Sequence, residues 1–370
     1  MIAPLKAGKI RLETEGRKPA LNLSAEKSRP RFEAITINRG IAFMGTKFTA
    51  WLSAAALAAL SVGTHAAAAA AAGDKTLDRP ALIKLADDYF TALLAHAPTK
   101  VPLATDLKTV ENAKRISTSE GLWKTTTAAP TEFKIVVPDT VSQQVGGMMM
   151  IQSEGKPAQV GFRLKVVNGK VVEAEHMIAV PREQMLANLQ KLRPAIPMEV
   201  PYEYRDSRGR LLHIAKSYYD ALDLNNGSLA PFAPDCERRE NGMRTAPFGG
   251  VVPGPGIPGA PPRPPGLVGM QDCKSQLDSQ SMAYITTIDH RRVEVADELT
   301  GLAIGFSHFH HAMTNKEYKI LNDPGREVNT MNYNPFDLPA MHIYKIWGGQ
   351  IHEIEAMGFM AGYNSPSGWE

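Results

Sequence analysis

The sequence predicts an α+β protein that contains two copies of one unit, each a helix followed by antiparallel strands. The first observation is a pair of segments, 85–94 and 214–222, whose apolar residues recur at helical spacing. The second is a constant interval of 22 residues from a tyrosine in each segment to a Glu-Asn pair beyond it: Tyr89 to Glu111, and Tyr218 to Glu240. Matching intervals of this kind indicate an internal repeat.

Both copies also end alike. An Asn-Gly pair at 168–169 and a Gly-Gly pair at 348–349 interrupt runs of β-forming residues, as is typical of two-residue hairpin turns. Matching positions lie 129 residues apart at the start of the copies and 180 apart at the end, so the second copy carries insertions. One insertion is 247–266, where 14 of 20 residues are proline or glycine, and a second spans roughly 314–339.

These patterns divide the chain into parts. We expect a first domain over 80–180, a short helix and proline-rich linker over 181–207, and a second domain over 208–370. Residues 44–72 are interpreted as a secretory signal peptide, because Lys47 precedes an uncharged apolar run and then small residues. Residues 1–43 are interpreted as upstream sequence included by a misplaced start codon, with a genuine cytoplasmic extension as the alternative.

The signal peptide predicts a periplasmic or secreted protein. No cysteine directly follows the apolar run, so a lipid anchor is not expected. Cys236 and Cys273 flank the proline-rich insertion, and in an oxidising compartment we expect them to form a disulfide. A reactive or metal-binding cysteine pair is the alternative.

Charge and motifs exclude several function classes. Residues 1–43 hold nine Lys/Arg and four Asp/Glu, whereas residues 73–370 hold 31 Lys/Arg and 34 Asp/Glu. Without a basic stripe in the latter part, nucleic acid is not an expected partner. No phosphate-binding glycine loop and no G-x-S-x-G motif occurs, which argues against nucleotide-binding proteins and serine hydrolases of those types.

The Tyr-x-x-Ala-Leu helix, the Glu-Asn pair and the closing Gly-x-[Ile/Val]-x-Glu-x-Glu strand resemble the SnoaL-like branch of the nuclear-transport-factor-two-like superfamily. The tandem arrangement resembles a secreted two-copy family of mostly unknown function. The resemblance covers about residues 80–180 and 208–363. It implies two tandem cone-shaped domains, each a curved antiparallel sheet wrapped around N-terminal helices. It also implies an apolar pocket for a small apolar or aromatic ligand and acid–base chemistry without a cofactor.

Histidines are the most prominent candidate site residues, and six of the ten follow residue 289. Strand alternation places His308 and His310 on one face with apolar residues: Leu302, Ile304 and Phe306. Three interpretations remain open. The pair could perform acid–base chemistry or binding, share a metal ion with His342 or Glu355, or lie solvated at a strand end. Because no metal-binding motif is present, we predict no metal.

The other candidates are polar residues that we expect near the same pocket. Tyr218 and Glu240 complete the predicted catalytic set. The alternative for Tyr218 is a core residue. Glu240 lies where a first strand should begin, and its alternative is a structural role. Arg291 and Arg292 could bind a carboxylate or phenolate of the substrate. The alternative is that they lie in solvent at the end of a strand. The predicted substrate-binding residues are Arg291, Arg292, His342, Tyr344 and Glu355.

Together these features predict an exported lyase, isomerase or dehydratase. In this scheme His308 or His310 moves a proton, and the polar residues above polarise an oxygen or orient the histidine. The alternative is a non-catalytic periplasmic binding or interaction module. We expect no stable membrane anchor, and either a monomeric pseudo-dimer or a homodimer. The tail 362–370 is expected to dock, for example over the mouth of the second pocket.

Overall fold

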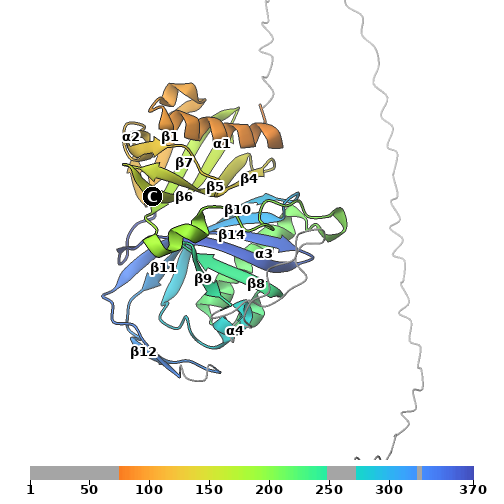
Figure 1. Cartoon of the computed structure of the whole chain (residues 1–370), viewed down its shortest axis with the longest axis vertical. Helices are drawn as coiled ribbons and strands as arrows, with labels where there is room; N and C mark the ends of the chain where they lie inside the picture. The colour runs from red at the N-terminus through yellow and green to blue at the C-terminus, as the bar shows by residue number, and fades with distance from the viewer. Residues whose placement is uncertain (1–74, 248–271, 323–326) are drawn as a thin grey trace, which may run out of the picture. The chain divides into compact units, whose positions relative to one another are not determined.

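The computed structural model describes residues 75–247, 272–322 and 327–370 (Figure 1). The segments 1–43 and 44–72 and nearly all of the insertion 247–266 lie outside these residues. The protein is α+β, as the sequence predicts, with one helix-covered sheet in each copy (Figure 1). Among the described residues, no helix combines the length and apolar character required to cross a bilayer.

The first copy begins with α1 (Arg79–Leu94). Asp78 caps this helix by accepting a hydrogen bond from the Ala81 backbone N–H at 2.9 Å. A 3₁₀ turn, η1 (Pro98–Lys100), and a short helix, α2 (Leu122–Thr125), are its other helical elements in the described part. Its strands are β1 (Leu103–Glu111), β2 (Lys114–Ile116), β3 (Thr126–Ala128), β4 (Lys134–Asp139), β5 (Gln144–Ser153), β6 (Lys156–Val167) and β7 (Lys170–Ala179).

The second copy repeats this plan, beginning with α3 (Arg208–Asp223), which Ser207 caps. Its strands are β8 (Phe232–Glu240), β9 (Met243–Ala246), β10 (Thr287–Asp297), β11 (Leu302–His311), β14 (Phe336–Trp347), β15 (Gln350–Gly358) and β16 (Ala361–Gly362). A separate ribbon consists of β12 (Glu317–Lys319) and β13 (Val328–Thr330), and the remaining helical elements are η4 (Gly227–Leu229) and α4 (Cys273–Asp278). Between the copies lie the 3₁₀ segments η2 (Glu183–Leu189) and η3 (Tyr202–Tyr204).

The two sheets share one topology. Along the described strands, the orders are β2-β1-β7-β6-β5-β3, with β4 also on β5, and β10-β11-β14-β15-β8-β9, with β16 also on β14. The predicted hairpins are present: Asn168 and Gly169, and likewise Gly348 and Gly349, have positive φ between paired strands. The sheets are mainly antiparallel, as expected, and each contains one parallel pairing: β1 with β7, and β8 with β15.

The Glu-Asn pairs end the first strand of each copy, whereas the sequence placed them at its beginning. Asn112 and Asn241 both have φ near 45°, a left-handed conformation that asparagine tolerates. The Asn112 side chain bonds the backbone N–H and C=O of Ile178, and the Asn241 side chain does the same with Gly358. Each asparagine therefore closes its first strand onto the last one.

The three largest clusters of buried apolar residues in the described part organise the fold. One lies under α1 in the first copy and one under α3 in the second. A third joins the outer faces of the two sheets, with Met148, Met150 and Met177 from the first copy packed with residues of the second: Ile304, Phe306, Met341 and Ile343. Each sheet is therefore covered on its outer face by the other copy.

This arrangement corrects the predicted direction of β11. Leu302, Ile304, Phe306, His308 and His310 do share one face, but it is the outer face, away from α3. The inner face carries smaller residues such as Gly305, where an added Cβ would lie 2.5 Å from the Tyr219 hydroxyl of α3. Close helix-on-sheet contact requires small residues, so the larger apolar set faces the other sheet.

Candidate active site in the second copy

A pocket lies inside the second copy, at the end of the core beneath α3. Its enclosed volume is small, about 30 Å³, which is room for roughly one or two water molecules. Apolar and aromatic side chains form most of its wall: Leu222, Met282, Ile285, Phe309, Leu338 and Ala340. Five polar residues also line it: Arg238, Glu240, Tyr284, His311 and His342. An apolar wall with few polar groups is typical of small-molecule sites.

Arg238 and Glu240 both reach the pocket because they lie two residues apart on β8, so their side chains lie on the same face of the strand. The Arg238 guanidinium donates to Glu240 Oε2 at 2.7 Å and to Thr245 Oγ1 at 3.2 Å. Burial alone would lower the pKa of Arg238, but the neighbouring oxygens of Tyr218 and Glu240 raise it overall. Arg238 is therefore a fixed positive charge, and its partner Glu240 keeps 30% of its side chain exposed.

Two tyrosines lie near this ion pair. Tyr284 lines the pocket and stacks on His311, with ring centroids 5.5 Å apart. Tyr218 is buried on α3 and is not part of the pocket wall. Burial raises the pKa of both phenols, so both remain neutral hydrogen-bond donors at physiological pH.

His342 forms part of the inner wall. Its Nδ1 lies 3.2 Å from the Tyr219 hydroxyl, and its ring stacks on Tyr344. Burial, and then the nearby Arg238 charge, hold the pKa of His342 well below its ordinary value. This imidazole is therefore neutral. Tyr344 packs in the same core, behind the pocket wall.

The structure does not bring His308 and His310 to this pocket, so their expected grouping with Tyr218 and Glu240 is wrong. Both lie on the outer face of β11. His310 Nδ1 lies 2.8 Å from Asp337, and its Nε2 lies 2.9 Å from Asp289. Neither Glu240 nor Glu355 orients them. The contacting carboxylates come from neighbouring strands, which only the strand pairing specifies.

Three predicted substrate-binding residues are occupied in ion pairs elsewhere. Arg291 bonds Asp220 and Asp223 of α3, at 2.7 Å each. Arg292 bonds Glu175 of the first copy, and Glu355 pairs with Arg193 of the linker at 3.0 Å. The three residues thus hold the helix, the first copy and the linker against the second sheet. None of the three lines the pocket of the second copy, where we expected them to bind the substrate.

The first copy fills the space that the second leaves open. At the position of Ala356, which lines the pocket, the first copy has His176. The His176 ring lies with Nε2 3.0 Å from the Tyr89 hydroxyl and Nδ1 3.1 Å from Glu111, the counterpart of Glu240. Glu111 also accepts a hydrogen bond from the Leu122 backbone N–H. In the first copy this chain of contacts lies at the position that corresponds to the pocket of the second copy.

Sequence reasoning did not identify Arg238, Tyr284 or the His176 contacts. Arg238 could have been found from strand alternation, because it lies two residues before Glu240 on the same face. Tyr284 lies in a loop after α4, and no local pattern indicates where that loop packs. The exchange of His176 in the first copy for Ala356 in the second is the sequence difference that falls at this pocket.

Two further expectations concern the chain near this site. Cys236 and Cys273 form a disulfide, as predicted, and tie α4 to β8. The C-terminal tail docks, but between the copies: the Trp369 ring lies 5.1 Å from the Arg163 guanidinium and 5.7 Å from that of Arg292. The suggestion that it covers the second pocket is therefore wrong.

Comparison with known families assigns the chain. Residues 75–178 and 204–358 match a family described as Domain of unknown function (DUF8021). The chain belongs to this family. The two matched stretches follow the two copies. No curated protein matches the chain.

Several solved structures are similar to part of the chain. A candidate polyketide cyclase from Xanthomonas campestris pv. campestris is 17% identical, with 41% of this chain and 92% of that chain covered and a TM-score of 0.25. AclR, a candidate hydroxylase from Streptomyces galilaeus, is 16% identical, with 34% of this chain and 92% of that chain covered and a TM-score of 0.23. An NTF2-like protein from Burkholderia thailandensis E264 is 15% identical, with 40% of this chain and 89% of that chain covered and a TM-score of 0.19.

Proposed function

We propose that the second copy of this DUF8021 protein is an acid–base enzyme of the lyase, isomerase or dehydratase type. The observation that supports this most directly is the Arg238–Glu240 pair at a pocket with apolar and aromatic walls. A fixed cation beside a carboxylate can stabilise a developing oxyanion while the carboxylate moves a proton. The substrate is therefore a small molecule with an apolar or aromatic body and a carbonyl or similar oxygen.

Each side chain has a defined role in this scheme. Arg238 and the Tyr284 hydroxyl donate to the substrate oxygen, and the Glu240 carboxylate takes a proton from the carbon next to the carbonyl. The electron pair of that C–H bond forms a C=C bond, and the π electrons of the carbonyl move to the oxygen, which gives an enol or enolate. Glu240 then returns the proton to another carbon, or the enolate electrons re-form the carbonyl and expel a leaving group from the adjacent carbon, and that group takes up the proton from Glu240. Neutral His342 holds one side of the ligand.

The experiment uses a panel of small cyclic enones and aryl ketones in D₂O, with NMR to detect deuterium uptake or a new product. Glu240→Gln keeps the size of the side chain and should slow the reaction by about 100-fold or more. Glu111→Gln is the matched control, since it makes the same change at the equivalent position of the first copy. Equal rates in wild type and Glu240→Gln, with unchanged melting temperatures, would refute the proposal.

A non-catalytic binding module is the second candidate, and the same pocket supports it. The two differ in what leaves the protein. Native mass spectrometry on protein incubated with the panel shows a binder as a ligand adduct that is recovered intact. An enzyme instead releases a product of altered structure or isotope content, and Glu240→Gln retains the adduct while product formation ceases.

We also propose that the protein is exported and works as a monomeric pseudo-dimer. The disulfide supports export, because such bonds persist in oxidising compartments. The shared apolar cluster supports a monomer, since each copy covers the outer sheet face of the other. Intact mass of protein from a bacterial periplasm tests the first, with a start near Ala67 expected. Analytical ultracentrifugation tests the second, and a stable dimer would contradict it.

A further inference from the structure

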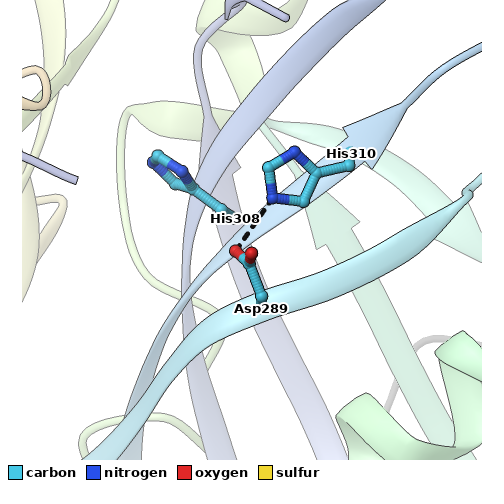
Figure 2. A group of neighbouring side chains, drawn as sticks. All are labelled: Asp289, His308 and His310. Carbon is cyan, nitrogen blue, oxygen red and sulfur yellow. Dashed lines mark ion pairs between the residues drawn. The ribbon is translucent and has the colours of Figure 1, made fainter. Parts of the chain in front are cut away.

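A second group of chemically active side chains lies on the outer face of the second sheet, away from the proposed active site. Asp289 of β10 pairs directly with His308 of β11, and His310 lies two residues further along that strand. Figure 2 shows the Asp289 carboxylate directed at His310, with the ring of His308 beside them. One ligand atom from each of the three residues lies within 4.8 Å of the others.

We propose that Asp289, His308 and His310 bind one divalent transition-metal ion of the zinc type. Two imidazole nitrogens and one carboxylate oxygen form a ligand set that zinc and its neighbours in the first transition row accept in proteins. Such ions bind these atoms at about 2.0–2.2 Å, which places neighbouring ligand atoms roughly 3–3.5 Å apart. In this group His310 Nε2 and the Asp289 carboxylate are 2.9 Å apart, and all three ligand atoms lie within 4.8 Å of one another.

The surroundings of His310 favour metal binding. Asp337, which is fully buried, lies 2.8 Å from His310 Nδ1 and also accepts a hydrogen bond from the Ser365 backbone N–H at 2.7 Å. A carboxylate on the far nitrogen of a histidine fixes the ring orientation and the tautomer, and outer-shell partners of this kind accompany most metal-bound histidines. His310 Nε2 lies 2.9 Å from the Asp289 carboxylate, without the alignment of a hydrogen bond.

His308 provides an independent observation. Its side chain is buried, with 5% of the residue exposed, yet Nδ1 has no hydrogen-bond partner among the described residues. An unpaired polar atom in a buried site is costly and calls for a ligand. A metal ion bridging His308 and His310 would give this ring a polar interaction.

The site is open to a possible fourth ligand. His308 and His290 line a pocket between the copies, together with Arg292 and with Glu175 and Met177 of the first copy. Asp289 keeps half of its side chain exposed, so an ion can enter from solvent. Three protein ligands leave at least one coordination position for water or an oxygen-bearing ligand. The partners differ from those considered from sequence, because His342 faces the opposite side of the sheet and Glu355 is paired with Arg193.

The test is zinc binding by the full chain, without a polyhistidine tag, after dialysis against a chelator. Isothermal titration with ZnCl₂ should give one ion per chain. His308→Ala and His310→Ala should each weaken binding by about 100-fold or more, and Asp337→Asn by the 10–100-fold that is typical of an outer-shell partner. His213→Ala, which removes an exposed histidine of α3, is the control and should bind as wild type.

Cobalt provides a second readout that does not depend on the stability of the variants. Co²⁺ added to the wild-type protein should produce visible absorption bands of a four- or five-coordinate ion, and Zn²⁺ should displace it. No bands in wild type, less than one zinc ion bound, or wild-type affinity in both histidine variants would overturn the proposal. Glu240→Gln should leave zinc binding unchanged, so this test and that of the proposed active site fail independently.

Discussion

Glu175 offers the sharpest test of how the two copies are joined. It lies on β7 of the first copy, where its two oxygens accept from Arg292 of the second copy at 2.6 and 2.9 Å. Arg163 of its own sheet donates to it as well, at 3.2 Å. Only 6% of the Glu175 side chain is exposed, against 27% for Arg292. The predicted perturbation is Glu175→Gln.

This substitution leaves two arginines facing a neutral amide in a largely buried site. Removing one partner of a buried ion pair costs about 3–5 kcal/mol of unfolding free energy. Because Arg292 retains some solvent, we expect the lower end, about 3 kcal/mol. The matched control is Lys84→Gln, which breaks an ion pair of nearly equal length, 2.7 Å, between side chains that are 74% and 44% exposed. That change should cost no more than about 0.5 kcal/mol.

Urea unfolding at pH 7 with the disulfide intact measures both variants. Burial alone would raise the pKa of Glu175, but Arg292 and Arg163 lower it overall. A depressed folded pKa means that the stabilisation is present above the unfolded value, about 4.3, and is lost as pH falls through the folded value. The difference between wild type and Glu175→Gln should therefore shrink in acid. A Glu175→Gln variant as stable as the control at pH 7 would refute the reasoning.

Two further changes test the fold itself. Replacing both Cys236 and Cys273 with alanine should lower the free energy of unfolding by about 3–4 kcal/mol, because the disulfide joins residues 37 positions apart in the sequence. A loss of less than about 1 kcal/mol in a urea titration would argue against this. Gly305→Ala should cost about 1–3 kcal/mol, because its new Cβ would lie 2.5 Å from the Tyr219 hydroxyl, and adding Tyr219→Phe should recover part of that loss. If thermal melts show the alanine variant to be neutral, Gly305 does not face α3.

Local signals determined much of this fold. Apolar periodicity located α1 and α3, and the pairs at 168–169 and 348–349 located the closing hairpins, because a two-residue turn needs positive φ at both positions. The repeat of the Tyr-to-Glu interval indicated two copies. Cys236 and Cys273 were paired correctly because they are the two cysteines of the sequence and flank an insertion. Each of these features depends on residues that are close together in the sequence, on a repeated interval, or on the number of cysteines.

The candidate site was only partly accessible from the sequence. Glu240 and His342 do line the pocket, whereas Arg238 and Tyr284 were not recognised. His308 and His310 were correctly assigned to one face of β11, but alternation specifies only that they share a face. Which face is inside depends on the packing of α3 against Gly305.

The sequence by itself therefore determined the repeat, the helices, the hairpins and the disulfide. Tertiary structure alone decided that β1 runs parallel to β7 and β8 parallel to β15, because these pairings join segments far apart in the chain. It also decided that the outer faces of the two sheets cover each other, which commits Arg292 to Glu175. Long-range packing has no local sequence signature, since each contact depends on where the other partner has been placed.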